Sequence, residues 1–158
     1  MSIKQKEEIT IWAFKDGKKG HEKQIEALIY EFSTRTKVQV VEIDCSTNFK
    51  NWPQNFKDYP DILIGAGNKT HHFMLQVKDH LKSPKTIVLM RPSFKPTQLF
   101  DFAIVPDMDK YIFYTPKNVL WTKGVLCKHY DKKPISGTGI IVIGGRSRHY
   151  SFSKKSDE

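Results

Sequence analysis

Three short glycine-containing segments carry the side chains of this sequence that could do chemistry. Residues 16–21 read Asp-Gly-Lys-Lys-Gly-His and join a β-like run to a helical one. Glycine lets the backbone approach a ligand closely, and a helix that begins near His21 offers free N–H groups to an anion. The spacing matches neither a Walker loop nor the GxGxxG dinucleotide fingerprint. The residues expected to bind a ligand here are Asp16, Gly17, Lys18, Gly20 and Gln24.

His21 is the candidate catalytic residue of this first segment. A helix N-terminus disfavours the imidazolium, so a ring placed there stays neutral and can act as a general base or hydrogen-bonding partner. A structural role at the helix start is the alternative. The adjacent His71 and His72 would diverge by about 100° on a helix, and no HExxH or CxxC accompanies them. We therefore expect no metal site and no cofactor.

The second and third segments follow two other apolar runs. Residues 65–70 combine two glycines with polar residues at a predicted helix start, which suits a phosphate, a carboxylate or a sugar hydroxyl. The alternative there is a tight turn with a capped helix. Residues 144–149 place glycines, two arginines and a serine after a strand, which suits a diphosphate, and a disordered basic terminus is the alternative. The candidate ligand-binding residues are Gly65, Gly67, Asn68, Thr70, Gly144, Gly145 and Ser147.

The apolar pattern predicts the strands and helices that must position these segments. Helical spacing of apolar residues predicts one helix over 21–32 and another that reaches about Leu81. Asn68 and Thr70 are the candidate capping residues at the start of the second helix. Strands are predicted at 8–14, 37–43, 61–66, 86–90, 102–105, 118–121 and 139–143. Alternating strands and helices, with strands apolar on both faces, predict an α/β fold. We expect a Rossmann-like, doubly wound, mostly parallel sheet whose ligands bind at the carboxyl ends of the strands.

Length, charge and cysteine content exclude several classes of protein. The 158 residues fit one domain, and no apolar run approaches the ~20 residues of a membrane-spanning helix. Because no secretory signal is visible, and Cys45 and Cys127 cannot build a disulfide framework, we predict free thiols and a cytoplasmic protein. The net charge of +9 comes from scattered lysines, which indicates a solvated basic surface rather than a nucleic-acid binder. Weak peripheral association with anionic membranes is the alternative interpretation.

Several motifs, taken in order, resemble those of one protein family. Residues 16–24, DGKKGHEKQ, resemble the DGKxGHxxQ opening of the mitochondrial fission ELM-type family. The resemblance covers nearly the whole chain, and Met108 departs from it by standing where many members carry a histidine. The other matching positions are 60–67, Phe100-Asp101, Val105-Pro106, Asp109, 118–119, 143–145, Ser147 and His149.

The resemblance implies half of a GT-B glycosyltransferase architecture, in which two Rossmann-like domains enclose a cleft. Residues 1–138 would form the N-terminal, acceptor-side domain, 139–152 the final strand and glycine loop that open a missing second domain, and 153–158 a disordered tail. It further implies a metal-independent transferase with His21 as base, a nucleotide-sugar donor, a glycan or lipid-linked acceptor, and a second domain or partner chain. A non-enzymatic adaptor that recruits a partner, and an inactive gene remnant, are the alternatives.

Overall fold

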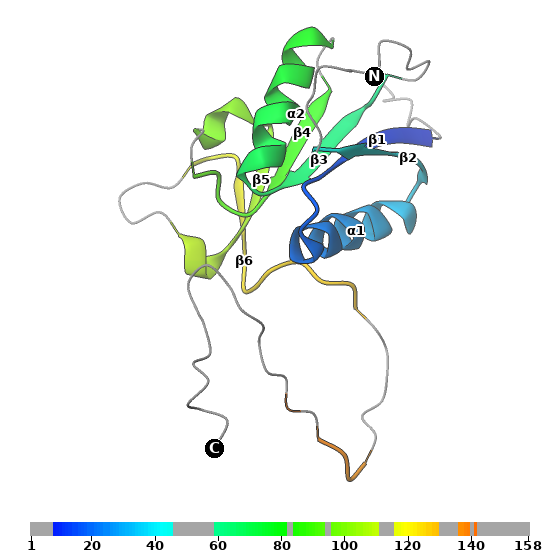
Figure 1. The fold of residues 1–158 in the computed structure, drawn as a ribbon, viewed down its shortest axis with the longest axis vertical. Coiled ribbons are helices and arrows are strands. Elements are labelled where there is room, and N and C mark those ends of the chain that lie inside the picture. Colours follow the sequence, from blue (N-terminus) through cyan, green and yellow to red (C-terminus); the bar gives the residue numbers. More distant parts are fainter. Residues whose placement is uncertain are drawn as a thin grey trace, which may run out of the picture.

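The computed structural model describes residues 8–45, 59–81, 84–93, 96–110, 116–129, 136–139 and 141. Within these ranges the predicted strands and both predicted helices are confirmed, with small shifts at their ends (Figure 1). The strand, glycine loop and tail predicted beyond residue 138 lie outside the described residues, apart from 139 and 141. The strands are β1 Glu8–Lys15, β2 Lys37–Asp44, β3 Ile62–Ala66, β4 Lys85–Leu89, β5 Phe102–Pro106 and β6 Val119–Thr122. The helices are α1 Lys19–Ser33 and α2 Asn68–His80, with short 3₁₀ turns at η2 Thr97–Leu99 and η3 Asp107–Asp109.

The six strands form one parallel sheet in the order β2-β1-β3-β4-β5-β6. The chain steps from β1 outward to β2, then returns to the other side of β1 to form β3 and continues in that direction. The order of the strands therefore reverses between β1 and β3, and this reversal is the position at which doubly wound sheets bind their ligands. The predicted α/β, Rossmann-like fold is confirmed.

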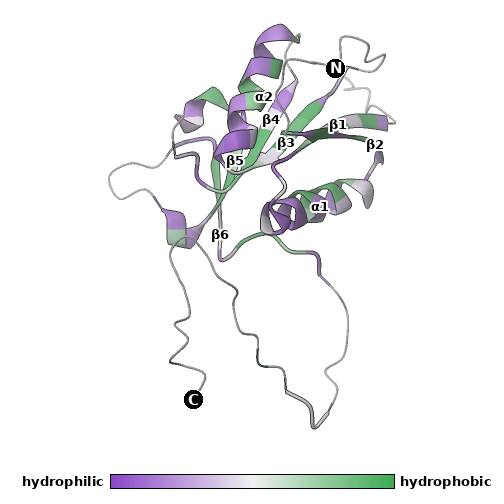
Figure 2. Ribbon diagram, in the orientation of Figure 1, coloured by the Kyte–Doolittle hydropathy of each residue, from purple (hydrophilic) through white to green (hydrophobic). Residues whose placement is uncertain are grey.

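The two helices cover opposite faces of the sheet (Figure 1). Successive side chains of a strand point to opposite faces, so Trp12 and Phe14 pack with Met74 of α2, whereas Ile11 packs with Ile25 of α1. Figure 2 shows the result as hydrophobic central strands flanked by helices that each carry a hydrophobic and a hydrophilic side. Burial on both faces explains why the central strands read as continuous apolar runs.

A glycine on β3 lets α2 approach the sheet closely. A Cβ atom added at Gly65 would lie 2.5 Å from Met74 Sδ and 2.7 Å from Thr70 Oγ1. The prediction that Asn68 or Thr70 caps α2 is wrong, because the N-cap residue is Gly67 and no side chain among the described residues caps the helix. Instead, the Thr70 hydroxyl donates to the Gly67 carbonyl at 2.8 Å, and Asn68 Oδ1 accepts from the Ser93 N–H at 2.9 Å.

Asp101 ties α2, β4 and the start of β5 together on the side away from the carboxyl ends of the strands. Its Oδ2 accepts hydrogen bonds from the Thr86 N–H at 3.0 Å, the Thr86 hydroxyl at 2.8 Å and Lys78 Nζ at 3.1 Å. Its Oδ1 accepts from Lys85 Nζ at 2.9 Å. Burial raises the pKa of this carboxyl, but the hydrogen bonds from Lys85, Thr86 and Lys78 outweigh it and hold the pKa well below its usual range. Asp101 therefore stabilises the fold in its ionised form.

We expect Asp101→Asn to lower the free energy of unfolding by about 1–3 kcal/mol at neutral pH, because the amide loses the charge that Lys78 and Lys85 pair with. A carboxyl whose pKa is depressed on folding contributes stability above its ordinary pKa of 3.8 and loses that contribution as the pH falls below it. Urea unfolding at pH 7 and pH 3 should therefore show a smaller difference between wild type and variant at pH 3. Asp79→Asn, which changes an exposed carboxylate on α2, is the matched control, and an equal difference at both pH values would contradict the role of the charge.

Candidate functional site

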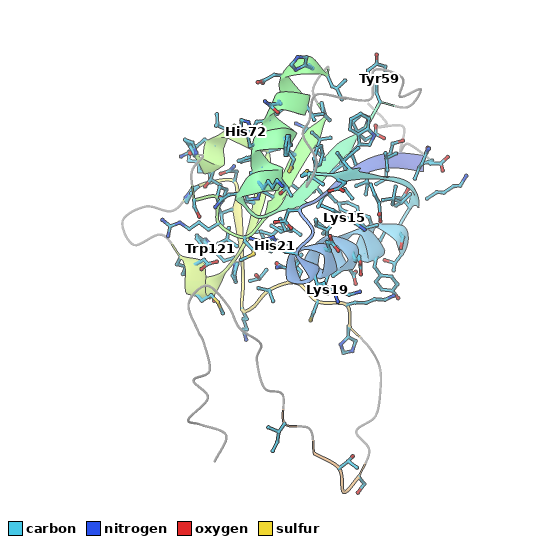
Figure 3. The ribbon with its side chains drawn as sticks, viewed as in Figure 1. Lys15, Lys19, His21, Tyr59, His72 and Trp121 are labelled. Atoms are coloured by element: carbon cyan, nitrogen blue, oxygen red, sulfur yellow. The ribbon has the colours of Figure 1, made fainter. Side chains whose placement is uncertain are left out.

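The loops after β1 and β3 meet at the reversal of strand order. Asp16 is the first residue after β1, His21 lies in the first turn of α1, and Gly67 is the first residue after β3. His21 Nδ1 lies 2.8 Å from Asp16 Oδ2. A Cβ atom at Gly67 would lie 2.5 Å from His21 Cε1 and 3.3 Å from Asp16 Oδ2. The two segments that the sequence predicts as ligand-binding are therefore in contact, and Figure 3 shows His21 at the start of α1 beside the strand ends.

The contact with Asp16 determines how His21 can react. The Asp16 side chain is only 3% exposed and that of His21 18%, so the carboxylate orients the ring while the ring keeps access to solvent. A carboxylate oxygen can only accept, so Nδ1 carries the proton and the neutral ring keeps its lone pair on Nε2. A carboxylate also stabilises the imidazolium that forms when Nε2 takes up a proton. The pair is thus built to accept a proton at Nε2.

The remaining residues of the first loop surround this pair. The Lys18 N–H donates to Asp16 Oδ1 at 3.1 Å, which fixes the second carboxylate oxygen. Gln24 is buried and donates from Nε2 to the Gly20 carbonyl at 3.3 Å, so it shapes the first turn of α1 from inside. Gly17 and Gly20 are exposed, and a Cβ atom at either would meet nothing within 4 Å. Their backbone is therefore open to a ligand.

The start of α2 forms the second side of the site. Gly67 has φ 86° and ψ 154°, a combination open essentially to glycine alone. The first N–H groups of a helix have no partner within the helix, and α2 carries no acidic residue in its first turn. Lys69 lies there instead, exposed to solvent. The positive end of the helix dipole repels the charge of the lysine, whereas both attract a bound anion.

A third loop, residues 90–93 after β4, also belongs to this edge of the sheet and was missed by the sequence analysis. Met90 Sδ accepts from Gln24 Nε2 at 3.5 Å, and the Ser93 N–H donates to Asn68 at 2.9 Å. The loop therefore contacts both α1 and the start of α2, with the exposed Arg91 between the two contacts. The signal that could have found it is the Arg91-Pro92 break directly after an apolar strand. The predicted residues Gly144, Gly145 and Ser147 lie outside the described residues.

Cys45 lies at the end of β2, close enough to the site for Asp16 and Lys69 to influence it. Burial raises the pKa of its thiol to about 12, and the charges of Asp44 and Asp16 add to this while Lys69 opposes it. Because the thiolate is the nucleophilic form of cysteine, Cys45 is inert at neutral pH. In the described part of the chain, no three His, Cys, Asp or Glu side chains are grouped so that they could hold a metal ion.

A hollow of about 360 Å³ lies at the opposite edge of the sheet. It is lined by Tyr59, Pro60, His80, Leu81 and Pro84, which lie before β3, at the end of α2 and before β4. Figure 3 shows Tyr59 far from His21. We place the candidate site at the carboxyl edge instead, because two helix N-termini and the Asp16–His21 pair converge there.

Comparison with known proteins identifies the family of the chain. The family model described as mitochondrial fission ELM1 matches residues 19–157. The chain belongs to the mitochondrial fission ELM1 family. No curated protein and no solved structure matches it.

The part of the chain that matches the mitochondrial fission ELM1 family includes most of the candidate site. His21, Gln24, the start of α2 and the loop at 90–93 all fall within residues 19–157, whereas Asp16 precedes them. Asp101, which the resemblance also included, contributes to stability rather than to this site. Across the described residues, no helix has the length and apolar character needed to cross a membrane.

Proposed function

We propose that this chain is the acceptor-side domain of a GT-B-like glycosyltransferase that uses a nucleotide-sugar donor. The contact between Asp16–His21 and the start of α2, at the reversal of strand order, is the observation that carries the proposal. Membership of the ELM1 family and the resemblance of that family to GT-B enzymes support it. The donor would bind to a second domain, supplied by the same polypeptide or by a partner chain.

His21 is the general base of the proposed reaction. In glycosyl transfer the acceptor hydroxyl loses a proton as it attacks the anomeric carbon of the donor sugar, and the nucleoside diphosphate departs. Nε2 of His21 is the atom that takes up this proton, while Asp16 keeps the ring oriented and stabilises the positive charge that develops. The proposed transfer is metal-independent.

The start of α2 holds an anionic group of the acceptor. Its first N–H groups, which have no partner within the helix, and Lys69 attract a phosphate or diphosphate, and the open backbone of Gly20 lets the ligand approach α1 as well. A lipid-linked phosphate would be an acceptor of this kind. Such an acceptor would bring the basic protein to a membrane surface, in keeping with weak peripheral association.

Titration with inorganic pyrophosphate, followed by calorimetry and by amide NMR shifts, tests the anion site. We expect binding in about the millimolar range, with the largest shifts at Asn68 and Lys69. Lys69→Gln should weaken binding about threefold, whereas Lys117→Gln, which removes the same charge before β6, should change little. Equal weakening by both variants would contradict a site at α2.

The donor requirement is tested by titrating UDP-N-acetylglucosamine into this chain alone and into the chain mixed with a donor-binding domain of the same family. We expect heat of binding, and transfer of radiolabelled sugar to a lipid extract, only in the mixture. Binding of the nucleotide-sugar to this chain alone, with pyrophosphate competing, would assign the donor to this domain and overturn the proposed division of roles.

A further inference from the structure

A buried histidine in the first turn of α2 has no hydrogen-bond partner for its ring among the described residues. His71, in the first turn of α2, is 1% exposed. In the part of the chain that the structure describes, neither of its ring nitrogens makes a hydrogen bond. Leaving a buried polar group unpaired costs about 1–3 kcal/mol, so such groups are rare and call for an explanation.

The surroundings of His71 place its ring next to the candidate site. Its ring centroid is 5.6 Å from that of Phe100, and the carbonyl groups of Leu89 and Gly65 lie close enough to favour protonation. These carbonyls are at the carboxyl ends of β4 and β3. The charges of both His21 and Asp16 also act on the ring. His71 is thus linked to the site through Gly67, since the His71 N–H donates to the Gly67 carbonyl at 3.2 Å and Gly67 lies against His21.

The charge state of His71 decides what it can bind. Burial lowers its pKa to about 4; nearby carbonyls and Asp16 oppose this shift and His21 adds to it, so the ring is neutral at physiological pH. A neutral imidazole has one N–H donor and one acceptor nitrogen. Either neighbouring carbonyl can serve the N–H after a small shift, but a carbonyl cannot donate to the acceptor nitrogen of the ring. A hydroxyl group supplies the missing donor, whereas a fully ionised phosphate does not.

We propose that His71 accepts a hydrogen bond from a hydroxyl group of the ligand, so that the site selects a phosphorylated polyol or sugar over a phosphate alone. This inference rests on the proposed binding of a phosphate at the start of α2, which lies one helical turn from His71. The phosphate supplies most of the attraction, and the hydroxyl supplies the selectivity.

The ligand reaches His71 when the loop at 90–93 moves. That loop follows the Leu89 carbonyl beside the ring, and Met90 has a φ of 70°, which costs a residue other than glycine about 1–2 kcal/mol. Among the described residues, the Ser93 N–H donates to Asn68 Oδ1 at the start of α2, and the Met90 N–H donates to the Ile104 carbonyl of β5 at 2.9 Å, so opening the loop breaks both hydrogen bonds. Release of the strained Met90 offsets part of the free energy needed to open the loop.

Affinities for methyl phosphate and for glycerol 3-phosphate, which adds hydroxyl groups to the same anion, test the proposal. In the wild type we expect glycerol 3-phosphate to bind about five- to tenfold more tightly than methyl phosphate. His71→Leu should abolish this ratio while methyl phosphate still binds. His71→Gln, which retains an acceptor, should restore part of it. His72→Gln, at the exposed neighbouring position on α2 (Figure 3), should leave it unchanged.

Unfolding of the same variants separates a ligand contact from a structural one. Removing an unpaired buried polar group is nearly neutral or stabilising, so His71→Leu should keep or raise the Tm while it loses the selectivity. Equal binding of the two phosphates to the wild type, or an unchanged ratio in His71→Leu, would overturn the proposed role of His71 but not the anion site. If neither phosphate binds the wild type, the anion site of the proposed function is wrong, and this inference fails with it.

Discussion

Replacing Gly67 with alanine is expected to damage the fold and the candidate site together. The φ of 86° and ψ of 154° at this position cost a residue with a side chain about 1–3 kcal/mol. The new Cβ would also lie 2.5 Å from His21 Cε1 and 2.7 Å from its Nδ1. The ring must shift to make room, which disturbs its 2.8 Å contact with Asp16, so we expect a total loss of about 2–4 kcal/mol. That corresponds to a fall in Tm of about 5–15 °C.

Thermal unfolding and pyrophosphate titration of Gly67→Ala measure the two effects separately. We expect the affinity for pyrophosphate to fall at least tenfold, because the start of α2 must shift to accommodate the methyl group. Gly124→Ala is the matched control, since a Cβ atom there meets nothing within 4 Å and its φ is ordinary. If Gly67→Ala and Gly124→Ala unfold at the same temperature, the close approach of His21 to Gly67 is not present in solution.

The sequence predicts the sheet well because its signals are local. β3 is apolar throughout and is followed by Gly67, and α1 repeats apolar residues at helical spacing, so both stand out without knowledge of their neighbours. The meeting of the first two glycine segments also follows from a general rule, since both lie at carboxyl ends of parallel strands. No local signal predicts that β1 and β3 are adjacent. This adjacency places Asp16 and His21 in contact with Gly67 rather than only at the same edge of the sheet.

Most of what sequence reasoning missed depends on contacts that the spacing of residues does not reveal. The cap prediction failed because Asn68 pairs with Ser93, 25 residues away, and Thr70 turns back to the Gly67 carbonyl. His71 drew attention only as half of a histidine pair, because polar residues on the buried face of α2 interrupt its apolar stripe. Their burial follows from the close approach at Gly65, which is a property of the packed structure and not of the helix alone.

Replacing His21 is expected to abolish most of the proposed transferase activity while substrates still bind. A positioned general base contributes about 10²–10⁴-fold to the rate, so His21→Ala should lower kcat by that factor. The phosphate contacts at α2 remain, so KM for the acceptor should change little. The measurement is sugar transfer by the protein combined with its donor-binding domain, with the acceptor varied at saturating donor. His72→Ala, at an exposed position on α2, is the control for the loss of an imidazole.

Asp16→Asn distinguishes a base from a residue that only positions the acceptor. The asparagine amide can donate to Nδ1, which moves the ring proton to Nε2 and removes the lone pair that would accept the acceptor's proton. If His21 is the base, Asp16→Asn should lower kcat nearly as much as His21→Ala does, and the double variant should be little worse than either. If His21 only holds the acceptor by a hydrogen bond, Nε2–H can still serve, and Asp16→Asn should raise KM with kcat largely kept. That second result would remove the proton-transfer step from His21 and leave the anion site at α2 untouched.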